Sequence, residues 1–192
     1  PNSIRELRPD LKAVSLLASM RHDTHDDRLL RGFAKILEEE GIQIRPSTFL
    51  IPELLAQEGC WTKRKPDKED QPDIELGWQM AKEIGRLDIG QCVVVSNGTV
   101  LAVEAVDGTD STIRRGGKLS RGHAVVVKVC KPNQDFRFDV PAVGVQTICT
   151  MQASGATILA IEASKSLVYD REEMIRYADA NGISIIALTK EN

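Results

Sequence analysis

Hydrophobic residues recur at helical spacing through the first half of the chain. Residues 10–20 and 26–40 each place their apolar side chains on one face, and Gly41 follows the second stretch as a typical helix end. Beyond Asp73, which is a suitable N-cap, the same spacing returns. The apolar face of this last stretch consists of Ile74, Gly77, Trp78, Ala81 and Ile84. The pattern therefore predicts three helices.

The stretches between these helices carry a weaker hydrophobic pattern or none. Residues 42–44 are typical of a strand end, and residues 46–55 of a turn that enters a short helix. Residues 62–73 contain no apolar side chain, two prolines and four residues of each charge, so burial cannot offset the entropy that ordering them would remove. We therefore expect a first domain over residues 1–61, a linker over residues 62–72 and a second domain over residues 73–192.

The hydrophobic pattern changes from helical to extended near residue 92. The apolar run CVVV at residues 92–95 is followed by Asn97 and Gly98 and then by TVLAVEAV at residues 99–106. An Asn-Gly pair supplies the two positive-φ positions of a tight hairpin turn. These residues therefore predict a β-hairpin.

The rest of the chain alternates between strand and helix patterns. Asp170 and Glu173 have the spacing of a capping box, and Gly182 marks the end of the helix that they begin. The remaining predicted elements are strands at residues 124–129, 157–163, 166–169 and 183–188 and a helix at residues 144–154. Because hairpins and helical connections occur together, we expect an α/β fold with a mixed sheet and flanking helices in the second domain.

Composition and charge narrow the classes of function. The net charge of −3 comes from interspersed residues of both signs, so the chain offers no broad basic face to nucleic acid or to an anionic membrane. No apolar run approaches the roughly 20 residues that a transmembrane helix needs. The four cysteines lie far apart without a CxxC pair, so we expect idle thiols in a reducing cytoplasm rather than disulfides or a zinc site.

A turn rich in glycine and hydroxyl side chains follows the predicted hairpin. It contains Gly108, Thr109 and Asp110, and Arg114 and Arg115 come shortly after it. Exposed backbone N–H groups at the start of a helix attract phosphate, and arginine adds charge-assisted hydrogen bonds. The local pattern also describes a helix capped by Asp110 with a solvated arginine pair, so both interpretations stay open.

The segment KPNQDFRFDVPAVG at residues 131–144 directly follows a very apolar strand, where a cleft opens in many α/β proteins. If the segment is extended, Asp135, Arg137 and Asp139 share one side. With Lys131 they suit a metal–phosphate site, in which a carboxylate holds magnesium or acts as a base and the cations neutralise phosphoryl oxygens. The alternative is an ion-paired surface loop anchored by its two phenylalanines.

The histidines are weaker candidates for chemistry. His22 and His25 could share a helical face, but the acidic residues around them precede a predicted helix, and capping explains them. His123 stands at the start of a strand, where a solitary histidine is usually structural. No Ser, His and Asp residues form a recognisable nucleophile motif.

Two long stretches resemble the C-terminal domain of LpxI-type UDP-2,3-diacylglucosamine pyrophosphatases. They are DIELGWQMAKEIGRLDIGQCVVVSNGTVLAVEAVDGTDSTIRRGGKLS and VVVKVCKPNQDFRFDVPAVGVQTI. RELRPDLKAVSLL and HDDRLLRGFAKILEEEGI resemble the end of the N-terminal domain of the same family. The resemblance therefore spans essentially the whole chain.

The resemblance implies an enzyme of lipid A synthesis that hydrolyses the pyrophosphate bond of UDP-2,3-diacylglucosamine to UMP and 2,3-diacylglucosamine 1-phosphate. It implies Mg²⁺ or another divalent cation as cofactor. It also implies a Rossmann-like N-terminal half that begins with a strand and a glycine-rich turn, and an active site between the two domains. Because the chain shows neither that strand nor that turn, we expect an incomplete fragment in which a helical remnant precedes the C-terminal domain.

The resemblance also implies the roles of individual residues. RFDVP is the most distinctive part of the match, and in it Asp139 is the expected metal ligand or activator of water, with Asp135 as a second catalytic candidate. Lys131 and Arg137 are the expected phosphate contacts. The facing wall is expected from Gly108, Thr109, Asp110 and Arg114.

The expected partners follow from this substrate. A lipid with two acyl chains lies at a membrane surface, so we expect a cytoplasmic protein that contacts the inner membrane transiently. The family resemblance implies a homodimer, and no nucleic acid partner is expected. The alternatives are a noncatalytic module that binds a sugar nucleotide or a phospholipid, and a purely structural domain. Metal-dependent release of UMP would separate the enzyme from both.

Overall fold

The computed structural model describes residues 26–190, and the side chains of residues 30–190. The chain divides into two compact units. Unit 1 comprises residues 1–49 and 135–139, and unit 2 comprises residues 50–134 and 140–192. The helix predicted at residues 10–20, and both His22 and His25, lie outside the described residues.

The longest described element of unit 1 is helix α2 (Asp26–Glu39), which confirms the helix predicted at residues 26–40. It ends where Gly41 adopts a φ of 81°. The strand end predicted at residues 42–44 is wrong, because these residues form no strand. Short 3-10 helices follow at η2 (Ser47–Phe49) and, in unit 2, at η3 (Pro52–Leu54).

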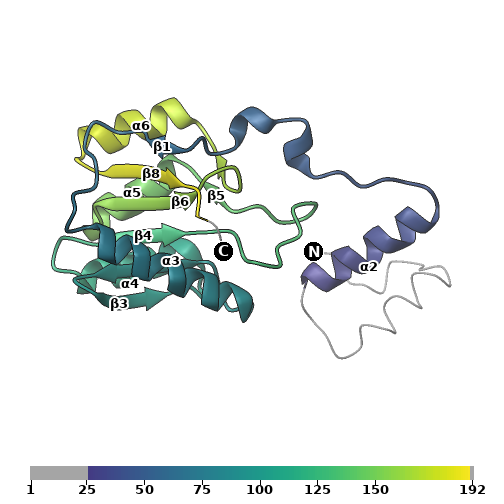
Figure 1. Cartoon of the computed structure of the whole chain (residues 1–192), viewed down its shortest axis with the longest axis horizontal. Coiled ribbons are helices and arrows are strands. Elements are labelled where there is room, and N and C mark those ends of the chain that lie inside the picture. The colour runs from purple at the N-terminus through teal and green to yellow at the C-terminus, as the bar shows by residue number, and fades with distance from the viewer. Residues whose placement is uncertain (1–25, 191–192) are drawn as a thin grey trace, which may run out of the picture. The chain divides into compact units, whose positions relative to one another are not determined.

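Unit 2 is built on a six-stranded mixed sheet with the order β1-β8-β6-β4-β2-β3 (Figure 1). Its strands are β1 (Gly59–Cys60), β2 (Cys92–Ser96), β3 (Thr99–Val103), β4 (Val125–Lys128), β6 (Ile158–Glu162) and β8 (Ser184–Leu188). Strands β4, β6 and β8 are parallel to one another, whereas β2 runs antiparallel to both β3 and β4 and β1 antiparallel to β8. This topology confirms the predicted α/β fold with a mixed sheet.

A second, two-stranded parallel sheet joins β5 (Ala142–Val143) to β7 (Leu167–Val168). The predicted hairpin is confirmed as β2 and β3, with φ values of 51° at Asn97 and 71° at Gly98. Both turn residues therefore take the left-handed conformation that the Asn-Gly pair predicts.

Helices cover both faces of the large sheet (Figure 1). Helix α3 (Gln71–Arg86) packs on one face, and α4 (Gly108–Leu119), α5 (Val145–Ser154) and α6 (Arg171–Ala180) pack on the other. Because successive strand residues point to opposite faces, Val93 and Val95 join the core under α3 while Val94 joins the opposite core. The central strands are buried on both sides, which explains their continuous apolar runs.

Two glycines let helices approach the sheet closely. A Cβ added at Gly77 of α3 would lie 2.5 Å from a methyl group of Val127, and one added at Gly116 of α4 would lie 2.5 Å from Val94 Cβ. Any larger residue would push the helix away from the sheet or deform the strand.

One predicted helix start differs from the structure, and another is confirmed but lacks its predicted capping box. Helix α3 begins at Gln71, ahead of Asp73, and the Asp73 carboxylate accepts backbone N–H bonds from Asn97 at 2.7 Å and Gly98 at 2.6 Å. Asp73 therefore fixes the hairpin turn instead of capping its own helix. Asp170 precedes α6 with a φ of 48° and makes no side-chain cap hydrogen bond, so the predicted capping box does not form.

The segment expected to be a linker is held to unit 2. The Thr62 hydroxyl accepts a bond from the Ile185 backbone N–H at 2.9 Å, and the Ser184 hydroxyl donates to the Arg64 carbonyl at 2.6 Å. Strand β1, just before this segment, pairs with β8. The side-chain composition of the segment did not reveal these backbone and hydroxyl contacts.

Candidate active site

Both sequence segments with candidate chemistry begin at one edge of the large sheet. We define the carboxyl edge as the side where the parallel strands β4, β6 and β8 end, at Lys128, Glu162 and Leu188. Strand β3 also ends there, because Val103 pairs with Val93 and Cys92 pairs with Lys128. Ligands of open α/β sheets bind outside the carboxyl ends of the strands. The start of α4 and Lys131 therefore share the edge where a ligand is expected.

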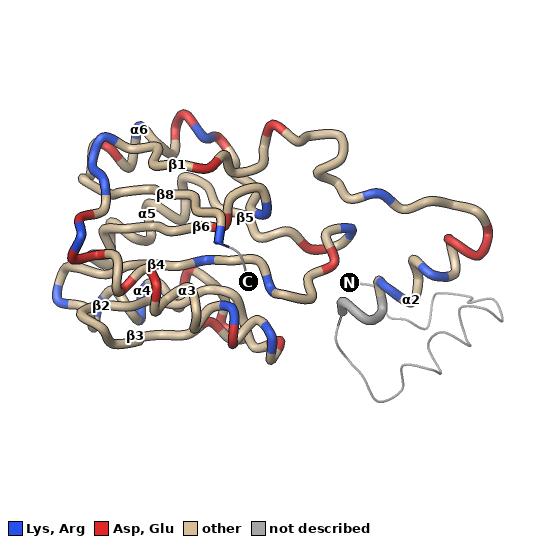
Figure 2. Tube along the Cα trace, viewed as in Figure 1, with Lys and Arg blue, Asp and Glu red and all other residues tan. Residues whose placement is uncertain are grey.

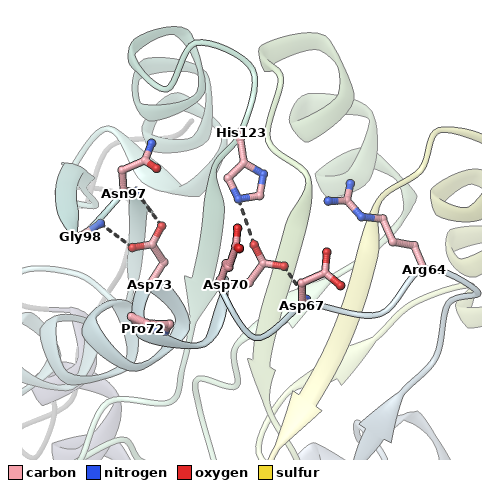
Figure 3. Close-up of a pocket in the computed structure, with 9 residues that line it drawn as sticks. Arg64, Asp67, Asp70, Pro72, Asp73, Asn97, Gly98 and His123 are labelled. Carbon is pink, nitrogen blue, oxygen red and sulfur yellow. Dashed lines mark hydrogen bonds and ion pairs between the residues drawn. The ribbon is translucent and has the colours of Figure 1, made fainter.

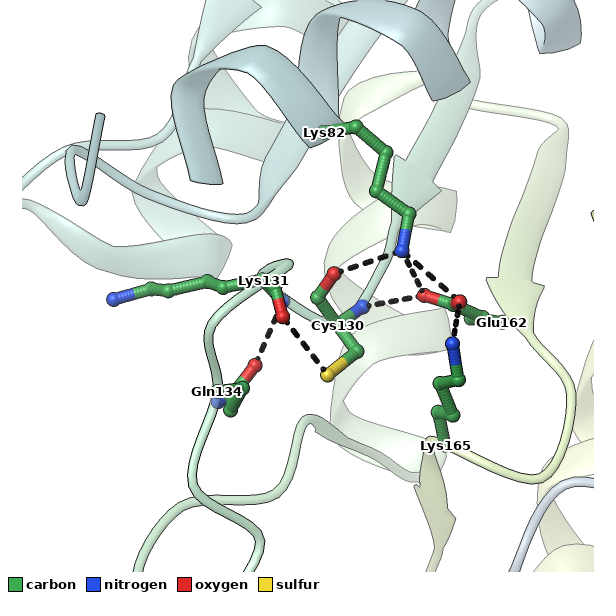
Figure 4. A network of polar contacts seen from close by, with 6 residues as sticks. All are labelled: Lys82, Cys130, Lys131, Gln134, Glu162 and Lys165. Carbon is green, nitrogen blue, oxygen red and sulfur yellow. Dashed lines mark hydrogen bonds and ion pairs between the residues drawn. The ribbon is translucent and has the colours of Figure 1, made fainter. Parts of the chain in front are cut away.

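A buried carboxylate with two lysines occupies the middle of the carboxyl edge (Figure 4). Glu162 ends β6 with a side chain that is 3% exposed. Its two oxygens accept bonds from Lys82 Nζ at 3.0 and 2.8 Å, from Lys165 Nζ at 2.9 Å and from the Cys130 backbone N–H at 2.9 Å. Burial alone raises the pKa of Glu162, but the bonds from Lys82, Lys165 and Cys130 outweigh burial and lower it below its ordinary value. Glu162 is therefore ionised at neutral pH.

The loop after β4 is tied to the same edge at both of its ends. At its start, Cys130 is held from both sides, since Lys82 Nζ donates to its carbonyl at 3.1 Å and Glu162 accepts its N–H. At its end, the Leu167 backbone N–H donates to the Pro141 carbonyl at 2.7 Å, and Lys128 Nζ donates to the Ala142 carbonyl at 2.8 Å. Residues of β4, β6, β7 and α3 thus fix the stems of the loop that carries the RFDVP motif.

The central part of this loop belongs to unit 1 and turns back on itself. The backbone N–H groups of Phe138 and Asp139 both donate to the Asp135 carbonyl, at 3.0 and 3.1 Å. The expectation that an extended segment aligns Asp135, Arg137 and Asp139 on one side is therefore wrong. A backbone turn replaces the alternation because these N–H groups bond within the segment.

Asp135 and Arg137 form a close ion pair. Arg137 donates through Nε at 2.9 Å and through Nη2 at 2.7 Å to the two oxygens of Asp135, and through Nη1 to Glu38 at 2.6 Å. The hydrogen bond from Arg137 lowers the pKa of Asp135, and Arg31, 3.8 Å away, acts in the same direction. Arg137 and Asp135 thus lie together as predicted, but their charges and hydrogen-bonding groups are largely paired with each other.

The glycine- and hydroxyl-rich segment forms the first turns of α4 rather than a separate turn. Gly108 begins the helix and has a φ of 78°, and Asp110 lies in the first turn, so Asp110 is not the cap. Thr109 donates from its hydroxyl to Glu104 at 2.6 Å, and the other oxygen of Glu104 accepts the Gln91 N–H at 2.9 Å. The helix start thus faces the carboxyl edge with Thr109 held in place.

The two arginines of α4 have different surroundings. Arg115 pairs with Asp107 and donates to the Val103 carbonyl at 2.7 Å, and the hydrogen bond from Arg115 lowers the pKa of Asp107. Arg114 lies 3.8 Å from Asp110 across one helical turn, and both side chains are exposed. Arg114 therefore remains accessible for a ligand, whereas Arg115 anchors the end of β3.

The remaining predicted phosphate contact, Lys131, pairs with Asp88 at 2.6 Å. Sequence reasoning missed Lys82, Glu162 and Lys165. One signal was present: Glu162 is the acidic residue that ends the apolar run TILAIE. Lys82 carries no such signal, because it lies 80 residues from Glu162 in the chain.

A groove of about 610 Å³, lined by apolar and charged side chains, runs along α3 beside this network. Trp78, Met80 and Pro132 are among its lining residues, and Lys82 and Lys190 also line it. Their ammonium groups lie 5.8 and 5.5 Å from the Trp78 ring centroid. Because Glu75 and Glu83 also line the groove, it joins apolar surface to charged groups of both signs at one end of the carboxyl edge.

The fit of a magnesium ion depends on the carboxylates available. Within the part of the chain that the structure describes, no three His, Cys, Asp or Glu side chains are grouped as metal ligands would be. Mg²⁺ is commonly held by only one or two carboxylates, and substrate phosphates complete its shell. Both oxygens of Asp135 accept bonds from Arg137, so Asp135 does not fit this role, and the assignment of the metal to Asp139 stays a prediction.

The opposite, amino edge of the sheet carries an acidic pocket of about 450 Å³ (Figure 3). Asp70 accepts the Asp67 backbone N–H at 2.7 Å and lies 3.0 Å from His123 Nε2, while Thr157 contacts His123 Nδ1 at 3.0 Å. These bonds join the start of α3 to the starts of β4 and β6. The surroundings of His123 agree with the structural role expected for it.

The four cysteines are free, and Cys92 and Cys130 are buried. Burial raises the pKa of the Cys92 thiol, which disfavours a reactive thiolate. Among the described residues, no helix combines the length and the apolar character that crossing a bilayer requires.

Comparison with known proteins identifies close relatives. A model of the LpxI C-terminal domain matches residues 57–186, and a model of the LpxI N-terminal domain matches residues 1–54. A protein of Caulobacter vibrioides named UDP-2,3-diacylglucosamine pyrophosphatase LpxI is 37% identical over 192 residues, which cover 95% of this chain and 69% of that protein.

Proposed function

Because the chain belongs to the LpxI family, we propose that it hydrolyses UDP-2,3-diacylglucosamine to UMP and 2,3-diacylglucosamine 1-phosphate in lipid A synthesis. The observation that carries the proposal is the cationic carboxyl edge. Along the Cα trace as a whole, basic and acidic residues are interspersed (Figure 2). At this edge, Lys82 and Lys165 surround a single buried carboxylate, Glu162, beside both stems of the RFDVP loop (Figure 4). A dianionic pyrophosphate needs such surplus positive charge, because removing its oxygens from water otherwise costs several kcal/mol.

The reaction requires water to attack the α-phosphorus. A new P–O bond forms, the bond from the α-phosphorus to the bridging oxygen breaks, and the sugar 1-phosphate leaves. We assign Asp139 to orient the water and accept its proton, because both oxygens of Asp135, the other carboxylate of this segment, accept bonds from Arg137. Mg²⁺ bound with Asp139 would supply further positive charge for the phosphoryl oxygens.

The other predicted residues act on charge and position. Lys131 and Arg114 stabilise the negative charge that develops on the phosphoryl oxygens, and the N–H groups at Gly108 and Thr109 do so at the start of α4. Asp135 positions Arg137, which stabilises the same developing negative charge. Asp135 is not assigned as the base, since its lowered pKa and its ion pair disfavour proton uptake.

The lipid part of the substrate fits the groove along α3. We assign the acyl chains to the part of this groove that Met80 and Pro132 line together with the largely buried Trp78. Such a substrate brings the protein to the cytoplasmic face of the inner membrane transiently. We further propose a homodimer and a division into domains at residues 1–61 and 73–192.

The test is release of UMP from UDP-2,3-diacylglucosamine by this chain. The reaction is run once with magnesium and once with a chelator, and chromatography measures the products. The proposal predicts UMP and the lipid 1-phosphate in equal amounts, and their loss when the metal is chelated. If the chain binds the nucleotide and returns it intact, the protein is a binding module. If it neither binds nor cleaves the nucleotide, the catalytic proposal is wrong.

A further inference from the structure

Glu162 has more positive charge around it than its burial requires. A buried carboxylate needs a cation and hydrogen bonds to its oxygens, and breaking such an arrangement is costly. Lys82, with a side chain that is 13% exposed, and the Cys130 N–H already supply one cation and bonds to both oxygens. Lys165 then adds a second ammonium group at 2.9 Å, so the three side chains together carry a net charge of +1.

The two lysines differ in how many donors they have left. An ammonium group has three N–H donors. Lys82 uses them on both oxygens of Glu162 and on the Cys130 carbonyl. Among the described residues, the Lys165 ammonium contacts Glu162 alone, and its side chain is 43% exposed. The surplus charge therefore lies at Lys165, with donors directed to solvent or to a ligand.

Lys165 is also well placed for a phosphate ligand. It lies in the turn after β6, at the carboxyl edge, three residues after Glu162 and two residues before Leu167 (Figure 4). Glu162 holds the start of the RFDVP loop at Cys130, and the Leu167 N–H holds its end at Pro141. The turn that carries Lys165 thus connects the two anchors of the loop.

We propose that Lys165, held by Glu162, binds a phosphoryl oxygen of the substrate's diphosphate. This inference rests on the proposed function for the identity of the substrate, but the binding chemistry needs only an anion with phosphoryl oxygens. Lys82 neutralises Glu162 and clamps Cys130, which leaves the ammonium of Lys165 as the group that meets the ligand. Lysine is an established phosphate ligand, because it supplies a compact charge with several donors.

The experiment measures the affinity of the whole chain for inorganic pyrophosphate by calorimetry, without metal and at low salt. Lys165→Gln is expected to weaken binding roughly tenfold, the effect of losing one charge-assisted hydrogen bond. Lys165→Arg should remain within about threefold of the unchanged protein, because it keeps the charge. The matched control is Lys68→Gln, which removes an exposed lysine two residues before Asp70, near the amino edge.

The outcomes separate this inference from the proposed function. Three results would show that Lys165 has no such role: Lys165→Gln binds pyrophosphate as tightly as the unchanged protein, Lys68→Gln weakens binding equally, or the unchanged protein does not bind.

In the UMP assay, Lys165→Gln should raise KM about tenfold and change kcat less. If no variant releases UMP while pyrophosphate binding still depends on Lys165, the anion site stands and the hydrolase proposal fails. Parallel titrations with orthophosphate and UMP distinguish a diphosphate site from one for a single phosphate.

Discussion

The two edges of the large sheet both carry many charged side chains, but these side chains are paired differently at each edge. At the carboxyl edge, the single carboxylate of Glu162 pairs with the ammonium groups of Lys82 and Lys165, and the side chain of Lys165 is partly exposed. At the amino edge, both oxygens of Asp73 accept backbone N–H groups of the hairpin turn. Both oxygens of Asp70 are likewise engaged, by the Asp67 N–H and His123.

The comparison shows that the number of charged residues does not identify a ligand site. The amino-edge pocket contains several acidic side chains and a histidine, yet its most buried carboxylates already have protein partners. At the carboxyl edge, the Glu162 network carries a surplus of positive charge, and Lys165 has donors left over. We therefore assign the amino edge to fold stability and the carboxyl edge to phosphate binding.

The largest effect on stability is expected from Glu162→Gln. The substitution leaves the ammonium of Lys82 nearly buried without its counter-charge, so the free energy of unfolding should fall by about 3 kcal/mol. Urea unfolding measures this change. The matched control is Glu75→Gln, which removes a largely exposed partner of Lys190 and should change stability by less than about 0.5 kcal/mol. Equal effects of the two substitutions would contradict a special role for the Glu162 network.

The stabilisation by Glu162 should depend on pH in one direction. Its pKa in the folded protein lies below the ordinary value of 4.5, so the ionised form is favoured by folding. The contribution is therefore fully present above the unfolded pKa and is lost as the pH falls through the lower, folded pKa. The difference in unfolding free energy between the unchanged protein and Glu162→Gln should shrink below about pH 4.5. A difference that grows on acidification would show that the sign is wrong.

A smaller effect is expected from Asp73→Ala at the amino edge. The substitution removes the acceptor for two backbone N–H groups of the hairpin turn, which should lower the free energy of unfolding by about 1.5 kcal/mol. Asp67→Ala is the control, because Asp67 lines the same pocket but contributes its backbone N–H to Asp70. Pyrophosphate affinity of the folded protein should be unchanged in both variants. Weaker binding in Asp73→Ala would place part of the anion site at the amino edge.

The smallest effect on stability is expected from Arg114→Gln. Arg114 and Asp110 are both exposed and 3.8 Å apart, so their ion pair should contribute less than about 0.5 kcal/mol. If Arg114 contacts substrate, the same substitution raises KM in the UMP assay. Thermal unfolding and KM measured on one sample separate the two roles. A large loss of stability with no change in KM would make Arg114 structural.

The sequence predicted the elements whose signals are local. The Asn97-Gly98 turn carries its own backbone preference, and the buried strands appear as apolar runs, so both were found. The helix start at Asp170 was found, but its capping box and the cap at Asp73 were wrongly predicted, because a capping residue is recognised by type and spacing alone. At Asp73 a tertiary contact replaces the local cap, because both carboxylate oxygens accept backbone N–H bonds from the hairpin turn.

The candidate site was predictable only in part for a similar reason. RFDVP and the start of α4 are continuous in sequence, and both segments could be recognised there. The Glu162 network joins Lys165, three residues away, to Cys130 and Lys82, which lie 32 and 80 positions away, so the local pattern reveals only its acidic residue. The turn at Asp135 also could not be predicted, because the alternation of charged and aromatic residues is typical of an extended segment.

The most direct test compares the hydrolytic activity of two matched variants. One carries Asp139→Asn in the RFDVP loop, and the other carries Asp67→Asn at the amino edge. The measurement is kcat/KM for UMP release from UDP-2,3-diacylglucosamine. The account predicts a loss of about a hundredfold or more for Asp139→Asn, the usual contribution of a positioned base, and a change within about twofold for Asp67→Asn. Full activity of Asp139→Asn, or an equal loss in both variants, would contradict the assignment of chemistry to the RFDVP loop.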